Sequence, residues 1–81
     1  MRLTDLARGQ SARVTQVRDL QAADSIARRL RDLGFVPGEP VRVVAQGPWQ
    51  ADPLLVQIGS TRFALRRAEA ERVDIACQVD A

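Results

Sequence analysis

The side chains best suited to chemistry in this sequence are arginines, and two of them, Arg66 and Arg67, are adjacent. All 12 basic residues are arginine, and a planar guanidinium group binds carboxylate or phosphate oxygens through two parallel hydrogen bonds. The pair lies at the end of an expected strand, next to an expected helical turn. Arg66 and Arg67 are therefore the best candidates for contacting an acidic protein surface or a nucleotide phosphate.

Three apolar side chains are further candidates for binding a partner protein. Trp49 is the only tryptophan and falls in the loop sequence GPWQADP, where its ring either anchors a partner or folds back on the core. Leu55 is predicted on the outward face of a strand, so it is either covered by the helix or part of an exposed apolar patch. Phe35 follows a helix end, at a bend that we expect to be exposed.

The residues needed for most catalytic sites are missing from this sequence. It contains no histidine, which removes the usual general base and the commonest metal ligand. Its one cysteine, Cys77, cannot form a zinc site alone, and its place on an inward strand face predicts a buried, inert thiol. No phosphate-binding glycine motif is present. We therefore expect no enzyme, no cofactor and no metal site, leaving only weak metal binding through carboxylates.

Length and composition indicate one small globular domain over residues 1–81. Hydrophobic residues make up 46% of the chain and charged residues 27%, as in folded proteins. The net charge of +2 is too small to argue for a nucleic-acid partner. A single cysteine is typical of a reducing compartment, and no apolar run approaches the roughly 20 residues of a membrane span. We expect a cytoplasmic protein that does not insert into membranes.

The hydrophobic pattern predicts one helix and five short strands. Helical spacing covers residues 22–33 and ends before Gly34, which favours a left-handed helix end. Alternating patterns predict strands at 11–17, 40–46, 54–58, 61–65 and 73–80, and a helical turn at 66–72. Val17 breaks the alternation of the first strand, which indicates a bulge or the end of that strand. These elements predict a mainly β fold, a small SH3-like β-barrel with one inserted α-helix and a short helical turn.

An ordered set of motifs runs through nearly the whole chain. It comprises Arg29, Leu30, Leu33 and Gly34 at the helix end, then Pro37, Gly38, Val41 and Val43, then Asp52 and Pro53, and finally Ala64, Leu65, Arg66, Glu69 and Ala70. In order and spacing this set resembles the FeoA-like family, the ferrous iron transport protein A. One position departs, because Ala51 stands where the family carries a glycine.

The resemblance implies a small cytosolic SH3-like protein that regulates or assembles with a membrane ferrous-iron transporter. That transporter carries a cytosolic GTP-binding domain, so the small protein would lie at the inner membrane only through its partner. The resemblance implies no enzymatic activity of the small protein itself. If Arg66 or Arg67 reached the partner's nucleotide, it could act as an arginine finger on GTP hydrolysis.

Two other binding functions stay open from the sequence. A nucleic-acid-binding barrel stacks bases on aromatic rings, but only Phe35, Trp49 and Phe63 are present, and Phe63 is predicted inward. An adaptor for proline-rich peptides needs an aromatic-lined groove, which one tryptophan and no tyrosine can hardly build. The sequence thus favours protein–protein interaction with the transporter over nucleic acid. It does not decide whether the chain associates weakly with itself.

Overall fold

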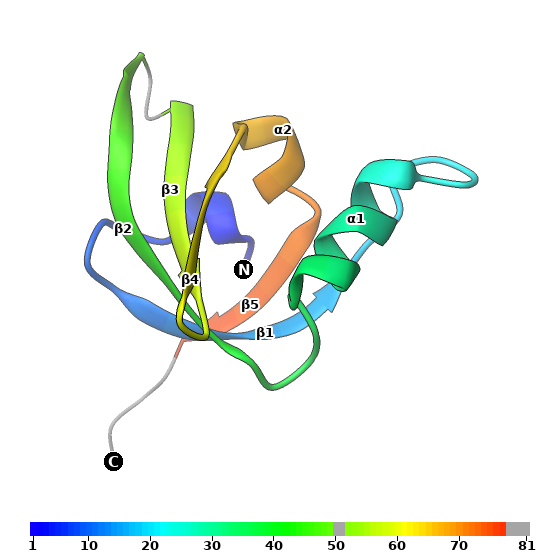
Figure 1. Ribbon diagram of the computed structural model, residues 1–81, viewed down its shortest axis with the longest axis horizontal. Helices are drawn as coiled ribbons and strands as arrows, with labels where there is room; N and C mark the ends of the chain where they lie inside the picture. Colours follow the sequence, from blue (N-terminus) through cyan, green and yellow to red (C-terminus); the bar gives the residue numbers. More distant parts are fainter. Residues whose placement is uncertain (50–51, 78–81) are drawn as a thin grey trace.

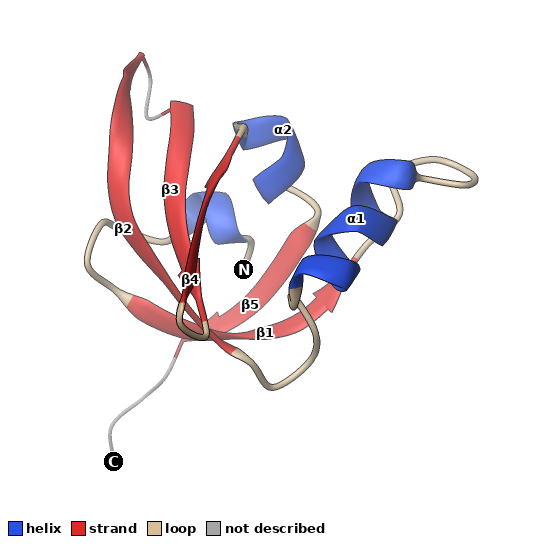
Figure 2. Cartoon of the chain, viewed as in Figure 1, coloured by secondary structure: helices blue, strands red, loops and turns tan. Residues whose placement is uncertain are grey.

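Five antiparallel strands form one sheet in the order β4-β3-β2-β1-β5, and this sheet curls into a partly open barrel (Figure 1, Figure 2). The computed structural model describes residues 1–49 and 52–77, apart from the side chain of Trp49. In chain order the elements are η1 (Leu3–Asp5), β1 (Ser11–Val17), α1 (Ser25–Leu33), β2 (Pro40–Trp49), β3 (Asp52–Ile58), β4 (Thr61–Leu65), α2 (Arg67–Ala70) and β5 (Val73–Cys77). The predicted strands, helix and helical turn are present, and the strand predicted at 73–80 is described as far as Cys77. The loop predicted for the sequence GPWQADP, 47–53, is wrong over most of its length, because β2 continues to Trp49, which pairs with Asp52 at the start of β3.

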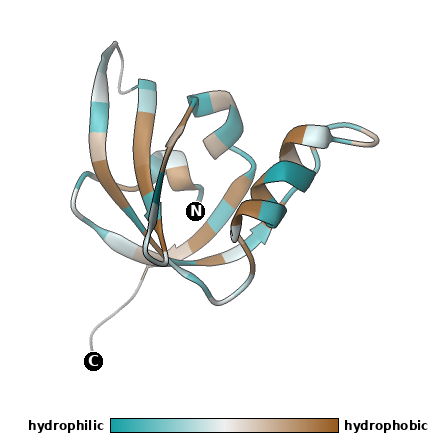
Figure 3. Ribbon diagram, viewed as in Figure 1, coloured by the Kyte–Doolittle hydropathy of each residue, from teal (hydrophilic) through white to brown (hydrophobic). Residues whose placement is uncertain are grey.

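The core lies on the concave face of the curled sheet. Val41 pairs with Ile58 and Val43 with Val56, so that buried side chains on neighbouring strands stand opposite each other. Figure 3 shows hydrophobic segments along β3 and alternating hydrophobic and hydrophilic segments along β5. Burying one such aliphatic side chain stabilises the fold by roughly 1.5–3 kcal/mol. The inward alternation of the strands therefore builds the core of the barrel.

Strand β1 carries the irregularity that its sequence indicates. Its pairing with β5 shifts register between Val14 and Gln16, which is the signature of a β-bulge. The shift returns Val17 to the buried side of the sheet although it breaks the simple alternation. The bulge therefore allows β1 to keep its apolar residues in the core over its full length.

Helix α1 begins three residues later than the predicted start at 22. Ala23 has a φ of 53°, in the left-handed region, so the helix cannot extend back through it. Asp24 caps the helix instead: its carboxylate accepts hydrogen bonds from the backbone N–H groups of Ile26 at 3.1 Å and Ala27 at 3.2 Å. The sequence signal for this start is the aspartate itself, a residue type favoured as a helix N-cap.

Asp24 is also one half of a buried ion pair. Its Oδ2 accepts from Arg72 Nε at 2.8 Å and from the backbone N–H of Leu20 at 2.9 Å. The Arg72 guanidinium also donates to the carbonyl of Ala68 at 2.6 Å, and the backbone carbonyl of Arg72 accepts from the backbone N–H of Arg18 at 2.8 Å. The hydrogen bond from Arg72 and those from the backbone lower the pKa of Asp24 from 3.8 to about 2. This pair joins the start of α1 to the segment between α2 and β5.

The end of α1 is where the sequence predicts it. Gly34 has a φ of 114° and donates its N–H to the carbonyl of Arg31 at 3.1 Å, and Phe35 donates to the carbonyl of Leu30 at 3.1 Å. These two bonds constitute a Schellman motif, in which the residue after the glycine commonly packs against the last helical turn. The motif turns the chain back toward the barrel.

Cys77 is exposed, so the prediction of a buried thiol is wrong. Val73 and Ile75 of β5 are buried as predicted, but Cys77, the last residue of the strand, is exposed although it pairs with the buried Ala12. The Cys77 sulfur lies 3.3 Å from the sulfur of Met1, which is itself exposed.

Acid should destabilise the wild-type fold more than an Asp24→Asn variant between about pH 4 and about pH 2. Because the folded-state pKa of Asp24 lies below its usual value, the stabilisation is complete above about pH 4 and is lost as the pH falls through about 2. At neutral pH the variant should be less stable, since Arg72 loses its counter-charge. Urea titrations at a series of pH values measure both effects. Equal acid sensitivity of the two proteins would contradict the stabilisation of the fold by the ionised Asp24 carboxylate.

Candidate partner-binding surface

The structure places the five predicted contact residues in three different environments. Phe35 is fully buried, and Leu55 is half-buried on the outward face of β3. Arg66 is exposed directly before α2, and Arg67 is half-buried as the first residue of that helix. Trp49 ends β2, and its side chain lies outside the described part of the chain. Only Leu55, Arg66 and Arg67 can therefore be examined as surface residues.

The expectation that Phe35 lies at an exposed bend is wrong. Its side chain is 0% exposed, and its ring lies 6.3 Å from that of Phe63, tilted by 50°. The cause is the Schellman motif, which directs the residue after Gly34 inward and leaves Val36, 39% exposed, at the bend. Phe35 is therefore a core residue, and its sequence signal was the apolar residue after a helix-ending glycine.

Leu55 lies in a short apolar row that crosses three strands. It pairs with Ala45 of β2 on one side and with Ala64 of β4 on the other. Ala45 and Leu55 are half-buried, and Ala64 is exposed. The outward apolar patch that the sequence allowed is therefore present, but it is narrow.

A polar row runs beside this apolar row on the same face of the sheet. Ser11 pairs with Arg42, Arg42 with Gln57, and Gln57 with Arg62, so that four strands contribute one residue each. Both arginines are exposed. The sequence reasoning did not single out Arg42 or Arg62, although the alternation of β4 places Arg62 opposite to the inward Phe63 and Leu65. These two arginines could be assigned to one row only once the pairing of the strands was known.

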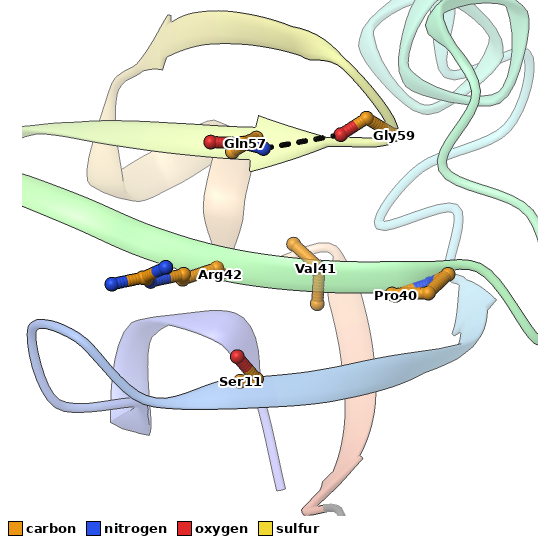
Figure 4. Close-up of a pocket in the computed structure, with 6 residues that line it drawn as sticks. All are labelled: Ser11, Pro40, Val41, Arg42, Gln57 and Gly59. Atoms are coloured by element: carbon orange, nitrogen blue, oxygen red, sulfur yellow. Dashed lines mark hydrogen bonds between the residues drawn. The ribbon is translucent and has the colours of Figure 1, made fainter.

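Three residues of the polar row, Ser11, Arg42 and Gln57, line a shallow hollow of about 160 Å³, shown in Figure 4. Ser11, Arg42 and Gln57 come from three adjacent strands, and the Gln57 amide donates to the carbonyl of Gly59 at 3.2 Å. Pro40 and Gly59 complete its edge. The hollow is too shallow to enclose a ligand but leaves the Arg42 side chain accessible.

The outward face of β2, β3 and β4 is positively charged. Among the described residues, the ion pairs involve Arg18, Arg29, Arg31 and Arg72, all of which lie elsewhere. Arg42, Arg62 and Arg66 form no ion pair within that part of the chain, and no acidic residue stands in either row. Free guanidinium groups beside an apolar row are suited to an acidic protein surface.

The carboxylates of Glu69 and Asp52 accept hydrogen bonds from the backbone at the start of α2. Glu69 accepts from the backbone N–H of Arg66 at 2.8 Å, and Asp52 accepts from that of Arg67 at 3.1 Å. Glu69 also lies 3.8 Å from a guanidinium nitrogen of Arg29. These bonds fix the start of α2 at the end of β4 and leave the Arg66 guanidinium without a local acidic partner.

The described residues offer neither a metal cluster nor a membrane span. Within residues 1–49 and 52–77, no three histidine, cysteine, aspartate or glutamate side chains gather in a way that could hold a metal ion. In the same part of the chain, no helix has the length and apolar character required to traverse a bilayer.

Comparison with known proteins identifies the family. The model of the FeoA domain matches residues 1–77. The chain belongs to the FeoA family. No curated protein sequence matches it significantly. The family is the one that the motifs of the sequence resemble, and that prediction is confirmed.

Solved FeoA structures share the whole architecture described above. FeoA from Stenotrophomonas maltophilia is 59% identical, with a TM-score of 0.88 over 94% of this chain and 89% of that one. It is described as an SH3 domain protein, in complex with zinc, with a proposed role as a bacterial ferrous iron transport activating factor. FeoA from Chlorobium tepidum is 34% identical, with a TM-score of 0.82 over 98% of this chain and 71% of that one. The predicted SH3-like fold is thereby confirmed.

Replacing Phe35 by alanine should lower the free energy of unfolding by about 3–5 kcal/mol, since it removes a buried ring and leaves a cavity. The adjacent Val36→Ala change is the matched control and should alter it by no more than about 0.5 kcal/mol, because Val36 is exposed. Denaturant titrations of both variants measure the difference. Similar stabilities would contradict the assignment of Phe35 to the core.

Proposed function

We propose that this protein is a non-enzymatic accessory protein of a ferrous-iron transporter, acting by docking on the transporter's cytosolic GTP-binding region. The observation that carries the proposal is the outward face of β2, β3 and β4. There the apolar row through Leu55 lies beside exposed Arg62 and Arg66, which form no ion pair among the described residues. A face of this kind suits a protein partner and does not need a catalytic group. Family membership supplies the physiological process, ferrous iron transport.

The proposal includes a place of action and a mode of action. The chain works as one domain in the cytoplasm and reaches the inner membrane only through the transporter. Its relative from Stenotrophomonas maltophilia, described as a proposed activating factor for ferrous iron transport, supports such an accessory role. The docked protein would bias the transporter between conformations by binding one of them more tightly.

A nucleic-acid-binding function finds less support in the structure. Single-strand binding by small barrels depends on exposed aromatic rings that stack with bases. Phe35 is fully buried and Phe63 is half-buried against it. The described side chains therefore provide no aromatic platform, and the arginine-rich face is better matched by an acidic protein.

Leu55→Glu should weaken binding to the purified cytosolic domain of the transporter by about tenfold, because it places a negative charge in the apolar row that faces an acidic partner. Leu20→Glu is the matched control, since Leu20 is also apolar and 53% exposed but lies in the loop before α1. Titration calorimetry with and without nucleotide measures both affinities. Failure of the wild-type protein to bind under any nucleotide or iron condition would overturn the proposed function.

GTP turnover by the same domain, at saturating concentrations of this protein, should be unchanged by Arg66→Ala. In this mode of docking Arg66 contributes only to affinity. Its loss should therefore weaken binding but leave turnover unchanged once the domain is saturated with the variant. Arg28→Ala, on the exposed side of α1, is the control. A fall of about 10³-fold or more at saturation would instead assign Arg66 to the nucleotide as an arginine finger.

A further inference from the structure

Strand β4 is the open edge of the sheet. The opposite edge, β5, is covered by the first residues of the chain, since Ile75 donates its N–H to the carbonyl of Met1 at 2.7 Å and Arg2 bridges to Asp74. Strand β4 pairs with β3, and no other backbone segment among the described residues hydrogen-bonds to it. An unpaired edge is a template on which another strand can be added.

The hairpin between β3 and β4 determines which groups face that edge. Ile58 pairs with Thr61 across the two-residue turn Gly59-Ser60, and Gly59 has a φ of 58°, as the first central residue of a type II′ turn requires. The residues flanking such a turn exchange both hydrogen bonds, and bonded and non-bonded pairs then alternate along the ladder. The backbone N–H and C=O groups of Arg62 and Ala64 therefore point away from β3, toward the open edge.

The side chains along this edge have a simple pattern. Arg62, Ala64 and Arg66 alternate along one face, and all three are exposed. In an extended strand, neighbours of this kind are about 7 Å apart, which places the two guanidinium groups on either side of a small apolar residue. Neither arginine forms an ion pair with a described side chain. A facing strand with carboxylates on every second residue would place one of them opposite each arginine.

We propose that the β4 edge receives an extended acidic segment of the partner protein as a sixth strand. The segment pairs its backbone with Arg62 and Ala64 and places its carboxylates against Arg62 and Arg66. This inference rests on the proposed function and names the chemistry of the partner's docking segment. Backbone pairing supplies affinity in this mode of recognition, and the side chains supply specificity.

A second copy of this chain is the poorer occupant of the same edge. Two β4 strands side by side would bring Arg62 and Arg66 of both copies together, and like charges on facing strands destabilise the pair. Edge arginines thus act against self-pairing while they favour an acidic segment. Charge complementarity is therefore what selects the partner.

The binding mode can be tested with a capped eight-residue peptide of alternating glutamate and valine, titrated into the full ¹⁵N-labelled protein. Backbone amide shifts should concentrate on Arg62, Ala64 and Arg66, and hydrogen exchange at Arg62 and Ala64 should slow by about tenfold or more at saturation. A lysine–valine peptide of the same length is the charge control and should not bind. Shifts located elsewhere, or equal binding of both peptides, would overturn the inference.

Two variants separate backbone pairing from charge. Ala64→Pro removes an N–H that does not bond to β3, so the hairpin should tolerate it as edge strands do, while peptide binding should weaken by about tenfold. Arg62→Glu with Arg66→Glu should weaken binding by a similar factor, whereas Arg28→Glu is the control for charge reversal on α1. Unchanged thermal melting shows that the variants are folded. Full affinity of either the Ala64→Pro or the double-arginine variant would contradict the proposed strand pairing.

The same variants distinguish this inference from the proposed function. If the transporter's cytosolic domain binds wild-type protein and both edge variants equally, docking stands and the β4 edge is not its site. If the domain does not bind the wild-type protein at all, the proposed function itself fails. Sedimentation of the wild-type chain should show a monomer, and a dimer that Ala64→Pro abolishes would assign the edge to a second copy instead.

Discussion

The buried ion pair between Asp24 and Arg72 is the interaction on which the arrangement of the elements depends. One carboxylate starts α1, holds the loop before it through Leu20, and binds a guanidinium from the segment that leads into β5. Arg72 extends the network to the carbonyl of Ala68 in α2. Both charges are withdrawn from water, so each is costly without the other. The helix, the helical turn and the last strand are thereby fixed relative to one another around a small core.

The binding face depends on that framework because α2 fixes where β4 ends. The carboxylates of Glu69 and Asp52 accept hydrogen bonds from the backbone at the start of α2, and the Arg66 side chain forms no ion pair among the described residues. An arginine held at a rigid junction loses less conformational freedom on binding than one in a mobile loop. The rows through Leu55 and Gln57 lie on strands whose other face is the core. A cationic outer surface thus follows from the same alternation that builds the barrel.

The sequence predicts most of this fold and less of its surface. Alternation in the five strands and the glycine after α1 have local causes, so they can be read from neighbouring residues. The start of α1 cannot, because the partner of Asp24 stands 48 residues further along the chain. The exposure of Phe35 and of Cys77 was predicted wrongly, since burial depends on which distant segments pack against a residue. Arg42 and Arg62 were missed because strand register brings them into one row, and register is a property of the assembled sheet.

The covered β5 edge has a consequence for how many molecules can join the sheet. If both edges were open, a strand added at one side would leave the other side able to accept a further chain, and such head-to-tail contacts can continue into a fibre. The backbone bonds of Met1 and Arg2 close that second side within the molecule. A strand added at β4 then leaves no second edge on which another chain could pair, so each copy of the protein binds one occupant.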